Sequence, residues 1–247
     1  MDAPVSGLAP VFSIENEAGR GAAVIVCEHA SNHFAPEWGD LGTTAKTRKS
    51  HAAFDPGALD LARALARQLD APLISGGLSR LIHDLDRPPH APTAMPIVSQ
   101  VHKIPGNREL TTTDRLRRVR QIYLPFHAAL SALLAERLAL GMPTALLTVH
   151  SFDPVYFGLH HNVELRVLHD ADPTLARGLA KAATGFSTRL NEPSGTWIEG
   201  SHTLARHATP LHLRHAMLEL RSDLLDKDLP GIAARLAPLL SGAIGAA

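Results

Sequence analysis

Three side chains with metal-binding or acid–base chemistry stand at the ends of short apolar runs in this sequence of 247 residues. They are His29, His150 and Glu219. Groups of this kind form hydrolytic zinc sites, in which about three protein ligands leave one position open for water and a nearby carboxylate acts as the base. The residue types therefore predict such a site, although no compact motif such as His-Glu-x-x-His is present. The alternative is that both histidines are ordinary buried, hydrogen-bonded side chains.

The apolar runs that lead to these residues predict strands of one sheet. Residues 24–27, 145–149 and 215–218 are short, apolar and partly β-branched, as expected for strands that are covered on both faces. Ligands of α/β sheets bind beyond the carboxyl ends of the strands. We therefore expect the three side chains to meet at one edge of the sheet.

Helical patterns alternate with the predicted strands. One helix is expected to begin at Asp55, which is a good N-cap, and another to run over residues 114–140 with a kink at Pro125. Residues 81–83 are a further strand candidate, and residues 1–20 are expected to have little structure. The alternation predicts an α/β fold: a three-layer α/β/α domain with a mixed, largely parallel sheet.

Neither an internal repeat nor a linker divides the sequence. We therefore expect a single domain over residues 1–247 with its core at about 22–240. Hydrophobic residues make up 45% and charged residues 19%, which is typical of a globular protein.

The charge and hydropathy patterns limit the partners. The formal net charge is zero, so nothing indicates a basic surface for nucleic acid or anionic lipid. No apolar run has the length of a membrane span, and residues 1–10 lack the features of a signal peptide. We expect a soluble cytoplasmic protein that binds neither membranes nor nucleic acid.

Seven segments of the sequence, taken together and in order, resemble the N-formylglutamate amidohydrolase family. The segments are Cys27–Asn32, Asp55–Ala58, Ser79–Pro89, Tyr123–His127, His150–Pro154, Asn191–Pro193 and Glu219–Leu224. This family is similar in fold to the zinc carboxypeptidases and the aspartoacylase-type deacylases. The resemblance implies a zinc-carboxypeptidase-like fold, one Zn²⁺ per chain and a small acidic substrate. It also implies the cleavage of N-formyl-L-glutamate to formate and L-glutamate, a reaction of amino-acid catabolism.

The resemblance implies that His29 and His150 are two of the metal ligands. The carboxypeptidase relatives take a third ligand from a Glu three residues after the first His, but here that position is Asn32, a poor zinc ligand. Asp55 is our preferred third ligand, with a plain helix cap as the alternative. Glu28 is the second choice, although adjacent strand residues point to opposite faces.

The resemblance also assigns roles beyond the metal. Glu219 matches the general base, with an ion pair to Arg221 as the alternative. Arg87 matches the residue that clamps a substrate carboxylate, a task that suits the guanidinium fork. Arg80 is assigned to the scissile carbonyl or to a structural role. Asn191 and Arg221 are placed with the substrate-binding residues.

Several positions leave alternatives open. The family has Asn where this sequence has Asp86, whose charge either weakens binding of an acidic substrate or orients Arg87. His127 lies behind a metal ligand or in the core, whereas His202 and His207 are interpreted as substrate contacts and not as ligands. The rival functions are a related zinc deacylase or carboxypeptidase-like peptidase with another acyl substrate, and a non-catalytic binding protein that has lost the metal.

Overall fold

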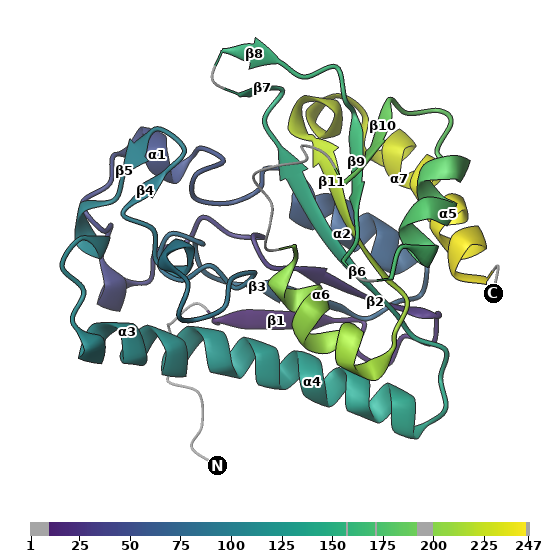
Figure 1. The fold of residues 1–247 in the computed structure, drawn as a ribbon, viewed down its shortest axis with the longest axis horizontal. Helices are drawn as coiled ribbons and strands as arrows, with labels where there is room; N and C mark the ends of the chain where they lie inside the picture. Colours follow the sequence, from purple (N-terminus) through teal and green to yellow (C-terminus); the bar gives the residue numbers. More distant parts are fainter. Residues whose placement is uncertain (1–9, 157, 171, 192–199, 246–247) are drawn as a thin grey trace.

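A seven-stranded sheet forms the centre of the computed structural model, which describes residues 10–156, 158–170, 172–191 and 200–245 (Figure 1). In spatial order the strands are β1 (Phe12–Glu15), β3 (Leu73–Gly76), β2 (Ala23–Cys27), β6 (Ala145–Phe152), β11 (His215–Arg221), β9 (Leu165–Leu168) and β10 (Thr188–Leu190). The four strands β3, β2, β6 and β11 are parallel to one another. β1 and β9 run antiparallel to their inner neighbours, and β10 is parallel to β9. The sheet is therefore mixed with a parallel centre, as expected.

Helices cover both faces of this sheet (Figure 1). One face packs against α2 (Ala58–Gln68), α5 (Thr174–Ala182) and α7 (Ser222–Gly245). The other face packs against α4 (Leu124–Ala139) and α6 (His202–His207). The expected three-layer α/β architecture is thus confirmed.

β2 shows why the central strands are apolar throughout. Ile25 and Cys27 belong to the core under α2, whereas Val24 and Val26 belong to the core under α4. Every residue of β2 is buried. Because both faces of the sheet are covered, alternating side chains all leave water, and the strand reads as a continuous hydrophobic run.

Short elements complete the fold. They are α1 (Ala45–Arg48), α3 (Thr112–Arg118), the hairpin of β4 (Val98–Ser99) and β5 (His102–Lys103), the hairpin of β7 (Val155–Tyr156) and β8 (Leu159–His160), and 3₁₀ turns at Pro36–Trp38, Pro92–Ala94, Pro105–Asn107 and Thr209–Leu211. None of the described helices combines the length and the apolar character needed to cross a membrane.

The structure corrects three local expectations. Residues 81–83 form a turn and not a strand. The segment before Arg20 contains β1, which pairs with β3 at the edge of the sheet. The long helix is divided by a π-helical segment, Val119–Tyr123, and Pro125 lies in the first turn of α4, where its missing N–H costs least.

Candidate functional site

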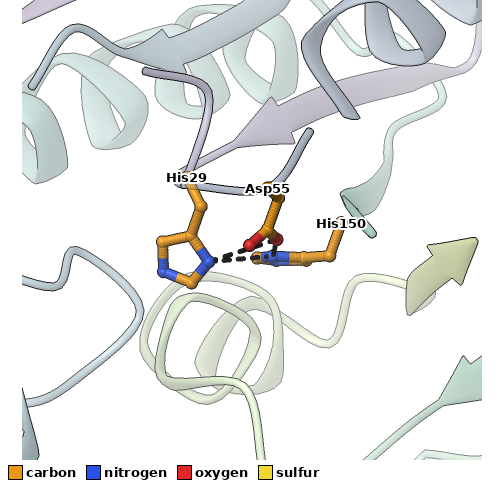
Figure 2. A group of neighbouring side chains, drawn as sticks. All are labelled: His29, Asp55 and His150. Carbon is orange, nitrogen blue, oxygen red and sulfur yellow. Dashed lines mark hydrogen bonds and ion pairs between the residues drawn. The ribbon is translucent and has the colours of Figure 1, made fainter. Parts of the chain in front are cut away.

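Two histidines and an aspartate converge beyond the carboxyl ends of the central strands (Figure 2). The Nδ1 atoms of His29 and His150 lie 3.1 Å apart. Asp55 Oδ2 lies 2.9 Å from His150 Nδ1 and 3.4 Å from His29 Nδ1. All three side chains are buried, and we call them the His-Asp-His cluster. The two histidines lie where the strand pattern of the sequence places them.

Three separate segments supply this cluster. His150 lies in β6, and His29 follows two residues after β2, which pairs with β6. Asp55 lies in the turn before α2, and its backbone N–H donates to the His29 carbonyl at 2.9 Å. The N-cap residue of α2 is Gly57, with a φ of 76° that favours glycine, so the expectation that Asp55 caps this helix is wrong. The Asp55 carboxylate instead faces the two imidazoles.

Each imidazole presents its other nitrogen to a buried carboxylate. His29 Nε2 donates to Asp84 Oδ1 at 2.8 Å, and His150 Nε2 lies 3.3 Å from Glu28 Oε2. Extending the β2–β6 register by two residues places Glu28 beside His150, which explains why it shares this face of the sheet. A carboxylate at Nε2 keeps the proton on that nitrogen, so the Nδ1 lone pair of each ring is directed at the centre of the cluster.

The donor set of the cluster fits a zinc ion. A tetrahedral ion with bonds of about 2.0–2.1 Å separates its ligands by about 3.3 Å. The three distances between the donor atoms, 2.9, 3.1 and 3.4 Å, are close to this spacing. Two imidazoles and one carboxylate are also the ligand types that catalytic zinc sites use, with a further position left for water.

The carboxylates dominate the electrostatics of the cluster. Burial lowers the pKa of His150, but the hydrogen bond that its Nδ1 donates to Asp55 and the nearby carboxylate of Glu28 outweigh this effect, and the net pKa lies well above its usual value. Burial and Arg80 lower the pKa of His29, but the charges of Asp84 and Asp55 raise it more, so it too lies above the usual value. The cluster therefore attracts positive charge, which a proton or a metal cation can supply.

A cavity of about 230 Å³ adjoins the cluster, and its wall carries Glu219. In the sheet register Glu219 of β11 pairs with His150 of β6 on one side and with Arg166 of β9 on the other. Paired residues point to the same face of a sheet, and all three line this cavity. Arg166 Nη1 donates to Glu219 Oε2 at 3.3 Å.

Comparison with known proteins identifies the family. The model of the family described as N-formylglutamate amidohydrolase matches residues 21–225. The chain belongs to this family. The crystal structure of gene product Atu2144 from Agrobacterium tumefaciens is similar to it with 39% sequence identity, a TM-score of 0.92 and 96% of each chain covered. An N-formylglutamate amidohydrolase from Ralstonia eutropha JMP134 has 18% identity and a TM-score of 0.67, with 95% of this chain and 97% of that chain covered, which shows the shared fold. No curated protein gives a significant match.

The family motif around residues 79–89 supplies two arginines to the cavity. Arg80 donates through Nε and Nη2 to Asp84 Oδ2, at 3.1 and 2.8 Å, and through Nη1 to Asp55 Oδ1 at 3.4 Å. It therefore neutralises the two carboxylates that hold His29. Arg87 also lines the cavity, and its Nη1 donates to the Asp86 carbonyl at 3.0 Å.

Asp86 occupies the position at which the resemblance led us to expect Asn. Its Oδ1 accepts from Ser201 Oγ at 2.7 Å and from the backbone N–H of Thr203, at the start of α6, at 2.9 Å. Burial, and then the charge of Glu28, raise the pKa of Asp86. Its Oδ2 lies 3.8 Å from Arg87 Nη1.

Two of the residues singled out in the sequence, Asn191 and Arg221, do not line the cavity. Asn191 is exposed, and its side chain bonds to His169 through both the backbone N–H and the ring. Arg221 donates to Asp223 Oδ1 and to the His161 carbonyl, both at 2.7 Å. The alternative that Arg221 pairs with Glu219 is therefore replaced by the Arg166 pair. Residues 192 and 193 of the Asn191 segment lie outside the described residues.

Asn32 is also directed away from the cluster, because its Nδ2 donates to the Arg48 carbonyl at 3.0 Å. Glu28 faces Nε2 of His150, the ring nitrogen that points away from the centre of the cluster. Of the three candidates for a third ligand in the sequence, Asp55 alone has an oxygen at the position where the two Nδ1 atoms meet.

The other histidines of the family motifs form a separate group. His127 Nδ1 and His207 Nε2 lie 2.8 Å apart, and Tyr123 Oη lies 2.6 Å from His202 Nε2. These side chains pack between α4 and α6 and are not among the residues that line the cavity. His127 is fully buried, which matches the core interpretation.

Sequence reasoning missed three polar residues of the site. Arg166 and Asp84 were not recognised, although Asp84 lies in the motif that supplies Arg80 and Arg87. His51 was the third: its Nδ1 lies 2.7 Å from Asp153 Oδ1, and its Nε2 lies 3.1 Å from Ser151 Oγ. Ser151 follows His150 and donates to the Pro56 carbonyl at 2.7 Å, so these bonds join the segments that carry His150 and Asp55. His51 stands four residues before Asp55 and outside the seven segments of the resemblance.

Proposed function

We propose that the protein is a zinc-dependent amidohydrolase that removes the formyl group from N-formyl-L-glutamate, giving formate and L-glutamate. The observation that carries the proposal is the His-Asp-His cluster, in which two carboxylate-held imidazoles turn their free nitrogens to one point beside Glu219. Family membership supports the reaction type, because the matching family is described as N-formylglutamate amidohydrolase. The protein from Ralstonia eutropha with the same fold carries that name too.

His29, Asp55 and His150 would hold the ion. A bound zinc ion supplies Lewis acidity, which makes water more acidic and polarises a carbonyl group. Asp84 and Glu28 keep the two imidazoles in the orientation and tautomer that binding requires. Arg80 offsets part of the buried negative charge of Asp55 and Asp84.

Glu219 is the base in this proposal. Its carboxylate takes a proton from the attacking water and delivers it to the nitrogen of the amide that leaves as an amine, so the proton is conserved through the reaction. The position of Glu219 on the cavity wall, in register with His150, supports this role. A carboxylate in this place contributes about 10²–10⁴-fold to the rate.

Arg87 binds a substrate carboxylate through the planar face of its guanidinium. Its place on the cavity wall supports this role. A cavity of about 230 Å³ suits a small N-acylated amino acid better than a protein chain. We therefore propose a small acidic substrate.

The test is a formate-release assay on the zinc-loaded protein, with N-formyl-L-glutamate beside its N-acetyl and N-succinyl analogues. We expect about one zinc per chain by elemental analysis and the highest kcat/KM for the formyl compound. Preference for another acyl group would assign the site to a related deacylase. A protein that takes up no zinc after supplementation would be a binding protein that has lost the metal.

The Glu219→Gln variant tests the role of Glu219 as the base independently of zinc binding. The amide has the shape of the carboxylate but cannot accept the proton, so we expect a loss of about 10²–10⁴-fold in kcat with the zinc content unchanged. Glu15→Gln is the matched control, because Glu15 pairs with Arg63 at the surface, far from the cavity in the sheet order. Retained activity in Glu219→Gln would remove this residue from the mechanism.

A further inference from the structure

Arg166 is the cation that contacts Glu219 among the described residues. Its Nη1 donates to Glu219 Oε2 at 3.3 Å, and both side chains are buried. The two residues are direct partners in the antiparallel pairing of β9 with β11. Direct partners on one face of a sheet have Cβ atoms about 4.5–5.5 Å apart, so the backbone itself holds this pair together.

The guanidinium of Arg166 is held on its other side by an aromatic ring. Its central carbon lies 3.9 Å from the centre of the Phe152 ring. Phe152 belongs to β6, two residues after His150, and lines the same cavity. A cation–π contact of this kind and an ion pair together leave the guanidinium little freedom, and Glu219 is restrained through it.

The other arginines near the site have different partners. Arg80 directs its contacts to Asp84 and Asp55, and Arg221 directs its contacts to Asp223 and to a backbone carbonyl. Neither has a contact with Glu219 among the described residues. The orientation of the Glu219 carboxylate therefore depends on Arg166.

We infer that Arg166 is a positioning residue that holds the Glu219 carboxylate facing the His-Asp-His cluster. This inference rests on the proposed function, in which Glu219 is the base. Arg166 lines the cavity, but its polar contact is to Glu219, so we expect its loss to affect the chemical step more than substrate binding. Displacing a catalytic group by about 1 Å can cost about 10²-fold in rate.

Steady-state kinetics of the zinc-loaded full chain tests the inference with Arg166→Gln and Arg166→Lys. We expect Arg166→Gln to lower kcat about 10- to 100-fold with KM changed less than about threefold, and Arg166→Lys to recover part of the loss. Arg235→Gln is the control, because Arg235 stacks on Phe186 at 4.3 Å, outside the cavity, and should behave as the wild type. A rise in KM with kcat unchanged, or no change at all, would overturn the inference.

A double variant shows whether Arg166 works through Glu219. In the Glu219→Gln background, Arg166→Gln should cause no further loss of kcat, whereas independent effects would multiply and contradict the inference. If the wild type hydrolyses none of the three substrates, the proposed function fails while the pair itself stays testable. The two substitutions should then be non-additive in urea unfolding, and additive effects would show that Arg166 does not hold Glu219.

Discussion

Two groups of histidines in this protein behave in opposite ways. His29 and His150 of the His-Asp-His cluster have pKa values raised above the usual value, because carboxylates outweigh the effect of burial. Four others, which we call the histidine core, have lowered values. They are His83, His127, His202 and His207.

The hydrogen bonds of the histidine core explain its neutrality. His127 Nε2 donates to the Leu85 carbonyl, so its Nδ1 accepts from His207 Nε2, whose ring in turn accepts from Ser131 Oγ. Each of these two rings donates one bond and accepts one, which only a neutral imidazole can do. Burial, and then the charge of the neighbouring His207, lower the pKa of His127 to about 2.

The two groups differ in their partners and not in their burial. His29, His127 and His150 are all nearly inaccessible to solvent. In the His-Asp-His cluster each outer nitrogen faces a carboxylate, and each inner nitrogen faces Asp55 Oδ2 at the point where a proton or a metal cation would bind. In the histidine core the nitrogens of His127 and His207 are used by neutral partners. A count of histidines in the sequence therefore does not identify a metal site, whereas the carboxylates around them do.

The largest difference should appear when one histidine of each group is replaced by glutamine and the two variants are compared. His150→Gln removes one of three ligands, so we expect zinc affinity to fall more than about 100-fold, beyond the usual effect of an outer-sphere residue, and activity to be lost. His207→Gln should keep about one zinc per chain and most of the activity. Zinc competition titrations and formate release measure both. Equal zinc loss in the two variants would mean that the groups are not functionally distinct.

A smaller effect is expected from the carboxylate behind His150. Glu28→Gln keeps the shape of the side chain but removes the charge that faces His150 Nε2. Residues in this position typically contribute about 10- to 100-fold to metal affinity, and we expect a loss in that range. Glu15→Gln is again the control. Unchanged zinc affinity would show that Glu28 serves packing alone.

The sequence allowed prediction of the features that depend on local pattern. Strand ends placed His29, His150 and Glu219 at one edge of the sheet, and the structure brings them to one cavity. The family motif is confirmed by the match over residues 21–225. The course of residues 55–58 was only partly predicted, because Asp-Pro-Gly also fits a helix start, whereas the helix begins after Gly57.

Features that depend on pairing between distant segments were missed. Arg166 lies in a strand whose alternating pattern was visible, but only its antiparallel register with β11 sets it beside Glu219. Nothing local distinguishes it from Arg221, which lies two residues after Glu219 and still bonds elsewhere. The predicted substrate role of Asn191 rested on a motif next to it, while its exposed side chain bonds to His169.

The smallest effect concerns pH and distinguishes the two groups by sign. His207 has its pKa lowered to about 4 by burial and then by Arg206, below the ordinary value of about 6.5. Below pH 6.5 the unfolded chain binds a proton that the folded chain refuses until about pH 4. The free energy of unfolding therefore falls as the pH drops through this window, by at most about 1.4 kcal/mol per pH unit for this histidine.

Urea unfolding of the metal-free protein between pH 7 and 5 measures this slope, and the His207→Gln variant isolates the contribution of one residue. The raised pKa values of His29 and His150 act with the opposite sign, since their contribution is present at low pH and is lost as the pH rises through their folded values. The contributions of His29 and His150 are the same in the wild type and in the His207→Gln variant, so they cancel in the difference between the two proteins. We expect the free energy of unfolding of the variant to fall less steeply as the pH drops. The difference in slope should correspond to about one bound proton. Parallel slopes in the two proteins would mean that His207 titrates normally, and the contrast between the two groups would then rest on the His-Asp-His cluster alone.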